Sequence, residues 1–275
     1  MKISIIMGSP RKKDSYRICK LIEESFINTS NFEFEYLYLK DYRIENCKGC
    51  DRCFQRGENY CPCKDDLATI KEKLLQADGI IFVSPVYACQ VTGLMKLTLD
   101  RLSYLFHRQE FVGKPALTVV TTGGGGQNPT GQYLKMTACG WGCNLIGELK
   151  IISPMFFESE NIKTAWGYNP KYHNSSLLKL QKFSSDFENA ILSGKLPTPT
   201  FYDIFMFQCL RSKTLVSKAD HNFWNEKGWL DSYYFYKTRL NPIKILFAKI
   251  IKSYIDFVAK KMFSRRSHCD KQYKI

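Results

Sequence analysis

The stretch Lys2-Ile-Ser-Ile-Ile-Met7 runs directly into Gly8-Ser-Pro-Arg-Lys-Lys-Asp-Ser15, and a helical pattern follows. The apolar residues predict a buried strand, and Gly8 lets the backbone turn at its end. A helix that begins after such a turn presents unpaired N–H groups, to which Ser9, Arg11 and Ser15 add donors. The stretch therefore predicts a phosphate-binding turn, with a plain helix cap as the alternative. Neither Gly-x-Gly-x-x-Gly nor Gly-x-x-x-x-Gly-Lys-Ser/Thr is present here, which favours a single monophosphate.

Strand-like and helix-like segments alternate along the next 180 or so residues. Strands are predicted at 2–7, 33–39, 79–84, 116–121 and 145–152, and helices near 15–28, 65–77, 91–106, 128–139 and 173–192. Several of these strands are continuously apolar and β-branched, which is typical of a parallel sheet covered on both faces. Five such units predict an α/β fold with an open, doubly wound, five-stranded parallel sheet. Ligands of such sheets lie at the carboxyl ends of the strands.

Two further turns are expected at that same edge. Pro85-Val-Tyr87 follows the third strand, and Thr121-Thr-Gly-Gly-Gly-Gly126 follows the fourth. Tyr87 offers an aromatic face for a planar ring, and the glycines let backbone N–H groups approach a ligand. Taken singly, Tyr87 could be a half-buried core residue and the glycines a mobile loop. Three such turns on one edge favour a binding site.

The order of these motifs resembles a known family. Gly8-Ser-Pro-Arg11, Ser84-Pro-Val-Tyr87 with Val91-Thr-Gly-Leu-Met-Lys96 and Asp100-Arg101, and Thr122-Gly-Gly-Gly125 are similar to the NAD(P)H-dependent FMN reductases and iron–sulfur flavoproteins of flavodoxin-like fold. The resemblance spans roughly residues 1–193. It implies that Ser9, Arg11, Ser15 and Tyr16 bind the FMN phosphate, that Pro85, Val86 and Tyr87 flank the isoalloxazine ring, and that Thr122, Gly123, Gly124 and Gly125 reach its polar edge. Asp14-Ser15-Tyr16 stands where the family usually has Gly-Asn-Ser/Thr, and Lys12 and Lys13 could offset the extra carboxylate.

A cysteine-rich segment forms the second group of candidate ligands. Cys47, Cys50 and Cys53 have the spacing C-x2-C-x2-C, which can wrap one side of an iron–sulfur cube. The same resemblance implies Cys61 as the fourth ligand of a 4Fe-4S cluster and leaves Cys63 as an extra thiol. Thiols without a metal, or zinc at four of the five cysteines, are the alternatives. The 11 cysteines of the chain, an odd number, argue against a secreted disulfide scaffold.

The C-terminal part of the chain differs in charge from the rest. Residues 205–275 hold 15 Lys/Arg and 5 Asp/Glu, which accounts for +10 of the net +14. Pro197-Thr-Pro199 marks a junction, so we predict a flavodoxin-like FMN-binding domain at 1–196 and a basic, aromatic-rich helical extension at 197–275.

Within this extension a helix is predicted from about Ile243 to Phe263. Its apolar stripe would be Phe247, Ile251, Tyr254, Val258 and Met262, with Lys244, Lys249, Lys252, Lys260, Lys261 and Arg265 largely elsewhere. Such a helix either docks on protein, in a dimer or on the core, or lies on an anionic membrane. The aromatic stretch from Trp224 to Tyr236 could pack on the core or cover a substrate pocket.

These observations predict a cytoplasmic FMN-dependent oxidoreductase in which NAD(P)H reduces the flavin by hydride transfer and an unidentified small molecule or protein accepts the electrons. No protein acid, base or nucleophile is required for that half-reaction, so no catalytic residue is assigned. The resemblance implies a homodimer or a larger assembly. The alternative is an electron carrier that a ferredoxin-type donor reduces. Nucleic-acid binding is not expected, because the basic segment carries no recognisable motif.

Overall fold

The computed structural model describes residues 1–27, 29–157 and 167–269. Two compact units make up the chain. Unit 1 comprises Met1–Lys48 and Cys63–Leu196, and unit 2 comprises Gly49–Pro62 and Pro197–Ile275. Most of the cysteine-rich segment is therefore grouped with the C-terminal helices and not with the sheet.

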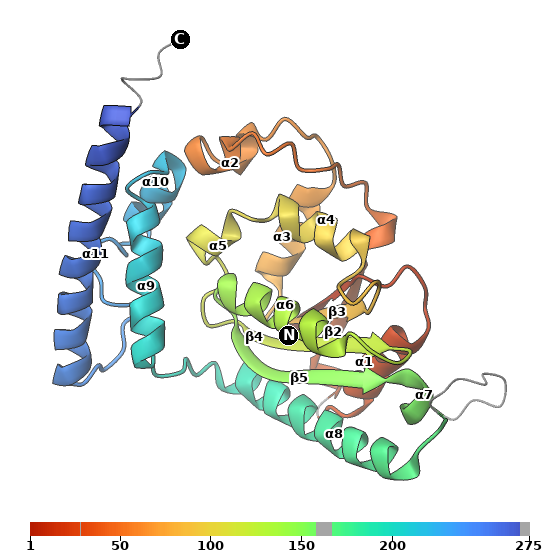
Figure 1. Cartoon of the computed structure of the whole chain (residues 1–275). Helices are drawn as coiled ribbons and strands as arrows, with labels where there is room; N and C mark the ends of the chain where they lie inside the picture. The colour runs from red at the N-terminus through yellow and green to blue at the C-terminus, as the bar shows by residue number, and fades with distance from the viewer. Residues whose placement is uncertain (28, 158–166, 270–275) are drawn as a thin grey trace. The chain divides into compact units, whose positions relative to one another are not determined.

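Unit 1 is built on a single parallel sheet (Figure 1). Its strands are β1 (Lys2–Met7), β2 (Glu33–Tyr38), β3 (Gly79–Pro85), β4 (Pro115–Thr122) and β5 (Asn144–Ile152), in the order β2-β1-β3-β4-β5. Every neighbouring pair is parallel, and β1 lies between β2 and β3. This order is that of the flavodoxin-like fold, whose ligand lies where β1 meets β3. The prediction of a doubly wound five-stranded sheet is confirmed.

Helices cover both faces of the sheet (Figure 1). One face carries α1 (Asp14–Glu24) and α8 (Pro170–Ser193), and the other carries α3 (Leu67–Gln76), α4 (Gly93–Arg101) and α6 (Gln127–Gly140). The short elements are η1 (Thr29–Asn31), η2 (Leu39–Asp41), α5 (Leu105–Arg108) and α7 (Ser153–Phe156). Buried side chains of the strands, among them Ile5, Ile81 and Val119, join α1 and α8 in one apolar core. Because both faces of the inner strands are buried, β1, β3 and β4 are mostly apolar, whereas the edge strands β2 and β5 also contain glutamates.

Unit 2 consists of helices and has an aromatic core of its own. Its elements are α2 (Arg52–Gln55), η3 (Glu58–Tyr60), α9 (Phe201–Lys213), α10 (Lys218–Glu226) and α11 (Pro242–Cys269). Trp224 is fully buried, and its ring packs against Phe207, Trp229 and Phe235 at centroid distances of 5.2, 5.5 and 5.6 Å. The aromatic stretch of the sequence thus forms this core. Segment 49–62 joins it through the Ser217 hydroxyl, which donates to the Phe54 carbonyl oxygen (2.5 Å).

The C-terminal helix α11 runs alongside α9 (Figure 1). Among its described side chains, Ala248 and Ala259 are buried, and Tyr254, one of the five residues of the predicted stripe, is 64% exposed. The predicted stripe was therefore misplaced around the helix at Tyr254. The side chain of Met262 lies outside the described residues. Among the described residues, no helix is long and apolar enough to cross a membrane.

Candidate functional site

The turn after β1 is packed tightly against the neighbouring strand and helix. The Gly8 N–H donates to the Val83 carbonyl oxygen (2.8 Å), and the Thr92 hydroxyl donates to the Gly8 carbonyl oxygen (2.8 Å). A Cβ at Gly8 would lie 3.0 Å from the Val83 oxygen and 3.1 Å from Met95 Cβ, so a side chain here would have to displace its neighbours. Glycine is needed at this position because the backbone approaches so closely.

The predicted phosphate ligands lie around this turn. The buried Ser9 hydroxyl donates to the Arg11 carbonyl oxygen (2.8 Å), and the Arg11 side chain is exposed. Lys13 stands at the N-cap position of α1. Since a lysine side chain has no hydrogen-bond acceptor, it cannot cap the N–H groups of the first helical turn, which stay available to an anion. Tyr16 packs its ring against Tyr36, with the centroids 5.3 Å apart.

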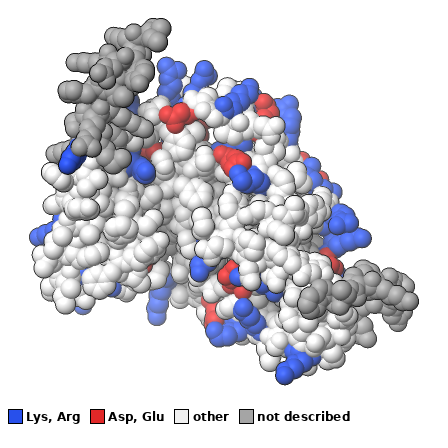
Figure 2. Space-filling view, viewed as in Figure 1, with Lys and Arg blue, Asp and Glu red and all other residues white. Residues whose placement is uncertain are grey.

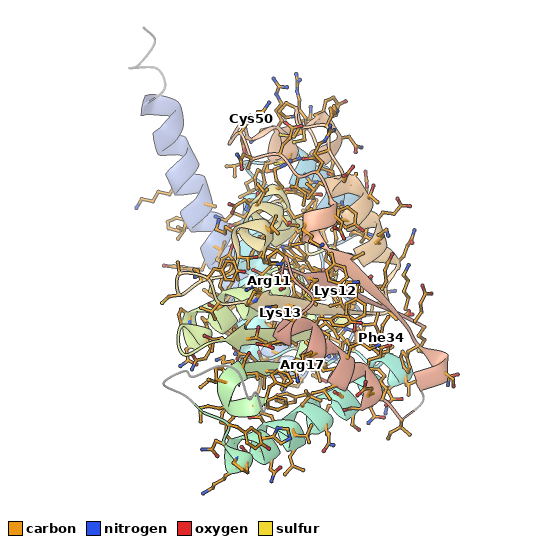
Figure 3. The ribbon with its side chains drawn as sticks, turned by 90° about the vertical axis from the view of Figure 1, so that its right-hand side faces the viewer. Arg11, Lys12, Lys13, Arg17, Phe34 and Cys50 are labelled. Carbon is orange, nitrogen blue, oxygen red and sulfur yellow. The ribbon has the colours of Figure 1, made fainter. Side chains whose placement is uncertain are left out.

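Four cationic side chains surround the same turn. Figure 3 shows Arg11, Lys12, Lys13 and Arg17 close together at the start of α1. The sequence suggested Lys12 and Lys13 as the cations that offset the Asp14 carboxylate. In the structure Asp14 pairs with Arg17 instead (3.7 Å). Lys12 instead places its ammonium 5.1 Å from the centre of the Tyr38 ring. The side chains of Arg11, Lys12, Lys13 and Arg17 thus make the start of α1 positively charged.

The turn after β3 is strained. Tyr87 and Gln90 exchange two backbone hydrogen bonds of 2.9 Å, and the residues between them, Ala88 and Cys89, have φ angles of 47° and 60°. A two-residue turn with both central residues left-handed normally contains Asn or Gly. Here two side chains that avoid this region are held in it, which costs of order 1 kcal/mol or more each. The turn leaves the Tyr87 side chain 42% exposed at the sheet edge.

We expect the substitution Cys89→Gly to stabilise the protein by about 0.5–1 kcal/mol, because glycine adopts the left-handed region without strain. Thermal or urea unfolding measures the change. The matched variant Cys89→Ala removes the same thiol and keeps the strain, so its stability should equal that of the parent protein. A gain from Cys89→Ala as large as that from Cys89→Gly would show that the thiol and not the backbone is responsible.

The loop after β4 is ordered by one threonine. The Thr122 hydroxyl donates to the Gly125 carbonyl oxygen (2.6 Å) and accepts from the N–H groups of Gly124 and Gly125 (3.2 and 3.1 Å). A Cβ at Gly123 or Gly125 would meet nothing within 4 Å, so the space above these two residues is open. Hydrogen bonds of Thr122 therefore hold the predicted glycine loop in one conformation.

Hydrogen bonds and close packing join the three loops. The Ser15 and Thr121 hydroxyls are hydrogen-bonded at 2.7 Å, and the Val86 N–H donates to the Thr121 carbonyl oxygen (2.8 Å). Gly126, with φ of 77°, is so close to the second loop that a Cβ would lie 2.7 Å from Val86 Cγ1 and 2.8 Å from Cys89 Cα. The predicted ligands thus meet at one edge of unit 1, although the Ser15 hydroxyl is already engaged with Thr121.

Four residues that hold these loops together are not among the predicted cofactor-binding residues. They are Ser84, Thr92, Thr121 and Gly126. Only Thr92 carries a local signal, because a threonine before a helical pattern is a preferred N-cap, and its hydroxyl accepts from the Met95 N–H (3.2 Å). Its second bond, to Gly8, joins positions 84 residues apart, and no sequence pattern indicates such a bond.

The cysteine-rich segment does not form a metal site as it stands. Cys47 and Cys50 are exposed, Cys53 and Cys61 are partly buried, and Cys63 is buried, where its thiol donates to the Asn46 carbonyl oxygen (3.6 Å). Over the described ranges 1–27, 29–157 and 167–269, no three His, Cys, Asp or Glu side chains gather so that they could hold a metal. Of the predicted ligands, Cys50, Cys53 and Cys61 belong to unit 2 and are therefore not gathered into a metal site there, and Cys47 belongs to unit 1.

A buried ion pair in unit 1 links the residues that precede and follow the cysteine-rich segment. The Arg101 guanidinium at the end of α4 binds the Asp65 carboxylate, and both side chains are at least 97% buried. Arg101 also donates to the Glu45 carbonyl oxygen (2.9 Å), and the Glu45 N–H donates to Asp65 (2.8 Å). Burial acts to raise the pKa of Asp65, but the bonds from Arg101 and from the Glu45 and Leu67 N–H groups outweigh it and hold the pKa below its usual value.

The strand order defines a flavodoxin-like protein, and the three joined loops lie at the carboxyl edge of its sheet. Residues 1–157 match the family model described as NADPH-dependent FMN reductase, and the chain belongs to that family. It is an FMN-dependent oxidoreductase that uses NAD(P)H.

Several proteins similar to this chain are named iron–sulfur flavoproteins. An iron–sulfur flavoprotein of Archaeoglobus fulgidus is 28% identical over 235 residues, which cover 84% of this chain and 100% of the relative. An iron–sulfur flavoprotein of Methanosarcina thermophila is 34% identical over 141 residues, which cover 49% of this chain and 71% of the relative. Both parts of the predicted resemblance, to FMN reductases and to iron–sulfur flavoproteins, are confirmed.

Solved structures agree on the fold. A structure of RosB with a bound intermediate, 8-demethyl-8-formylriboflavin-5'-phosphate, matches with a TM-score of 0.53 at 12% identity and covers 88% of this chain and 92% of RosB. A flavone reductase matches with a TM-score of 0.52 at 17% identity and covers 72% of this chain and 66% of the reductase. At these identities the likeness extends to the fold alone.

Proposed function

We propose that FMN binds where the three loops of unit 1 meet, with its phosphate at the turn 8–15 and its isoalloxazine between the turn 85–90 and the loop 122–126. The observation that carries this proposal is the network of hydrogen bonds and close contacts joining the loops, since loops held in fixed relative positions preorganise a site for a rigid ring. The open space over Gly123 and Gly125, the exposed Tyr87 ring and the uncapped first turn of α1 fit such a ligand.

The protein's own residues would bind and orient the cofactor. Arg11 and the first-turn N–H groups of α1 would hold the phosphate by charge-assisted hydrogen bonds. Tyr87 would lie against the ring, and the Thr122 hydroxyl keeps the glycine loop in one shape. When bound, FMN supplies the redox chemistry by taking a hydride from NAD(P)H and releasing electrons to an acceptor. No side chain of the site is required to transfer a proton in the reductive half-reaction.

Rapid mixing tests the donor. We expect oxidised, FMN-loaded protein to lose its flavin absorbance quickly when mixed with NADPH or NADH, and the faster of the two identifies the preferred nucleotide. A flavin that stays oxidised with both nucleotides and is reduced by a ferredoxin-type donor would contradict the reductase and support the electron carrier instead. The acceptor is then found by adding quinones, nitro compounds or free flavin to the reduced protein.

A second candidate function includes an iron–sulfur cluster on Cys47, Cys50, Cys53 and Cys61. The spacing of these cysteines and the names of the two archaeal relatives favour it. Within unit 2 the thiols of Cys50, Cys53 and Cys61 are not gathered, so no step is assigned to a cluster. Burial raises the pKa of the Cys19 and Cys143 thiols, which makes both poor ligands because metals bind the thiolate.

Iron and sulfide analysis after anaerobic reconstitution decides between these alternatives. If a cluster forms, we expect about four irons per chain, loss of the iron in Cys50→Ser, and no loss in Cys63→Ser, which is the matched control. Protein that carries FMN and no iron would rule the cluster out, and zinc found in its place would assign the cysteines to a structural site.

The state of assembly and the location in the cell belong to the same proposal. We expect a cytoplasmic homodimer or larger oligomer. Its mass can be measured directly by light scattering after size-exclusion chromatography. We also expect the flavin to remain with residues 1–196, the predicted FMN-binding domain, because every residue proposed to bind it lies there.

A further inference from the structure

An apolar stripe runs along the exposed face of α11. Ile243, Leu246, Ile250, Tyr254 and Phe257 follow one another at spacings of three and four residues, and each is 57 to 68% exposed. Residues at these spacings share one face of a helix. A surface helix normally keeps its outward face polar, and a contiguous apolar patch marks a surface that binds a partner or a membrane.

This stripe is not the face by which α11 packs within unit 2. The opposite side holds the buried Ala248 and Ala259, and the Phe247 ring meets Phe201 edge-on at 5.2 Å. An ion pair between Asp256 of α11 and Arg211 of α9 (2.5 Å) also holds the two helices together. Because α11 is held by its other face, the stripe is not needed to attach the helix to α9.

The charge around the stripe is positive. Lys249 and Lys261 are exposed on α11, and Asp256, the one acidic residue in the sequence 242–269, is already paired with Arg211. Figure 2 shows the flank formed by α9 and α11 as mostly uncharged atoms with separate blue groups of lysine or arginine. Residues 205–275 as a whole contribute a net charge of +10.

We propose that the stripe of α11 binds an anionic lipid surface. The apolar side chains would enter the boundary between headgroups and acyl chains, with Tyr254 and Phe257 at that interface, while Lys249 and Lys261 would face the lipid phosphates. The charge argues against a second copy of the chain, because two segments of +10 would repel each other across the same face. An anionic bilayer complements both the apolar stripe and the lysines around it. This surface involves no residue of the flavin site.

Sedimentation with lipid vesicles tests the proposal on the full chain. We expect the protein to pellet with phosphatidylglycerol vesicles at low salt, not with phosphatidylcholine vesicles, and to be released as the salt concentration rises. The double variant Leu246→Gln/Ile250→Gln should lower the partition coefficient about tenfold or more. Lys249→Gln should lower it about fivefold, from about 1 kcal/mol for each cation near the surface.

Matched controls lie on unit 1. Leu178 of α8 is 67% exposed, as the stripe residues are, and Lys195 is exposed as Lys249 is. Neither Leu178→Gln nor Lys195→Gln should change binding, and circular dichroism and FMN content verify that each variant folds. The proposal fails if the parent protein ignores anionic vesicles, or if the controls lose as much binding as the stripe variants. It also fails if Leu246→Gln/Ile250→Gln splits an oligomer in light scattering without altering vesicle binding, because a second copy then covers the stripe.

Discussion

The variant Asp65→Asn is expected to lower the free energy of unfolding by about 3–5 kcal/mol, because it leaves the Arg101 guanidinium buried without its counterion. Asn keeps the shape of the side chain, so the loss reports the charge. Both ends of the cysteine-rich segment depend on this pair, since Asp65 accepts from the Glu45 N–H and Arg101 donates to the Glu45 carbonyl oxygen. Chemical denaturation of the full chain, monitored by circular dichroism, measures the change in the free energy of unfolding.

Helix α4 supplies the control. Asp100, next to Arg101, pairs with Lys96 at the surface, where both side chains are about half exposed. Asp100→Asn should therefore cost only about 0–1 kcal/mol, as exposed pairs do. If Asp65→Asn and Asp100→Asn lower the free energy of unfolding by similar amounts, the buried pair does not stabilise the fold more than an exposed pair does.

The effect of Asp65 should also depend on pH. Its pKa is lower in the folded chain than in the unfolded chain, so its stabilising contribution is present above the unfolded value of about 3.9 and is lost as the pH falls through the folded value. The difference between the parent protein and Asp65→Asn should therefore be constant near neutral pH and shrink below about pH 4. A difference that persists unchanged in strong acid would point to packing and not to charge.

Replacing Arg11 by Ala is expected to weaken FMN binding by about 1.5–3 kcal/mol, the value of one hydrogen bond to a charged group. Riboflavin lacks the phosphate, so its affinity should barely change. Fluorescence titration of the apoprotein with both ligands gives the two dissociation constants. The exposed cation Lys182, which pairs with Asp186 on α8, provides the control variant Lys182→Ala. Equal losses for FMN and riboflavin in Arg11→Ala would refute the phosphate site.

The sheet was predictable because its signal is local. Strands β3 and β4 are runs of apolar, β-branched residues closed by turn residues, and both were located to within one residue at each end. Helix α9 was not predicted, because Phe201–Lys213 is apolar and aromatic around most of its circumference and gives no helical period. Its start did carry a signal, since Thr200 and Asp203 form a capping box.

The stripe predicted for the C-terminal helix α11 was misplaced at Tyr254 for a related reason. Large apolar side chains occur on both sides of this helix, so periodicity alone cannot decide which side is buried. The structure buries the side with Ala248 and Ala259, because small residues let α9 approach closely. At the flavin site, the turns were predictable from glycines and polar residues, whereas the bond between Ser15 and Thr121 joins positions 106 residues apart and depends on the finished sheet.

The hydrogen bond between Phe54 and Ser217 has a consequence for the order of folding. The two residues are 163 positions apart, although both belong to unit 2. At about 5–20 residues per second, a ribosome needs roughly 8–33 s to pass from one to the other. During that interval the rest of unit 1, from α3 to α8, is synthesised, while α2 has no α10 to pack on. Segment 49–62 can therefore pack on α10 only after all five strands of the sheet have left the ribosome's active site.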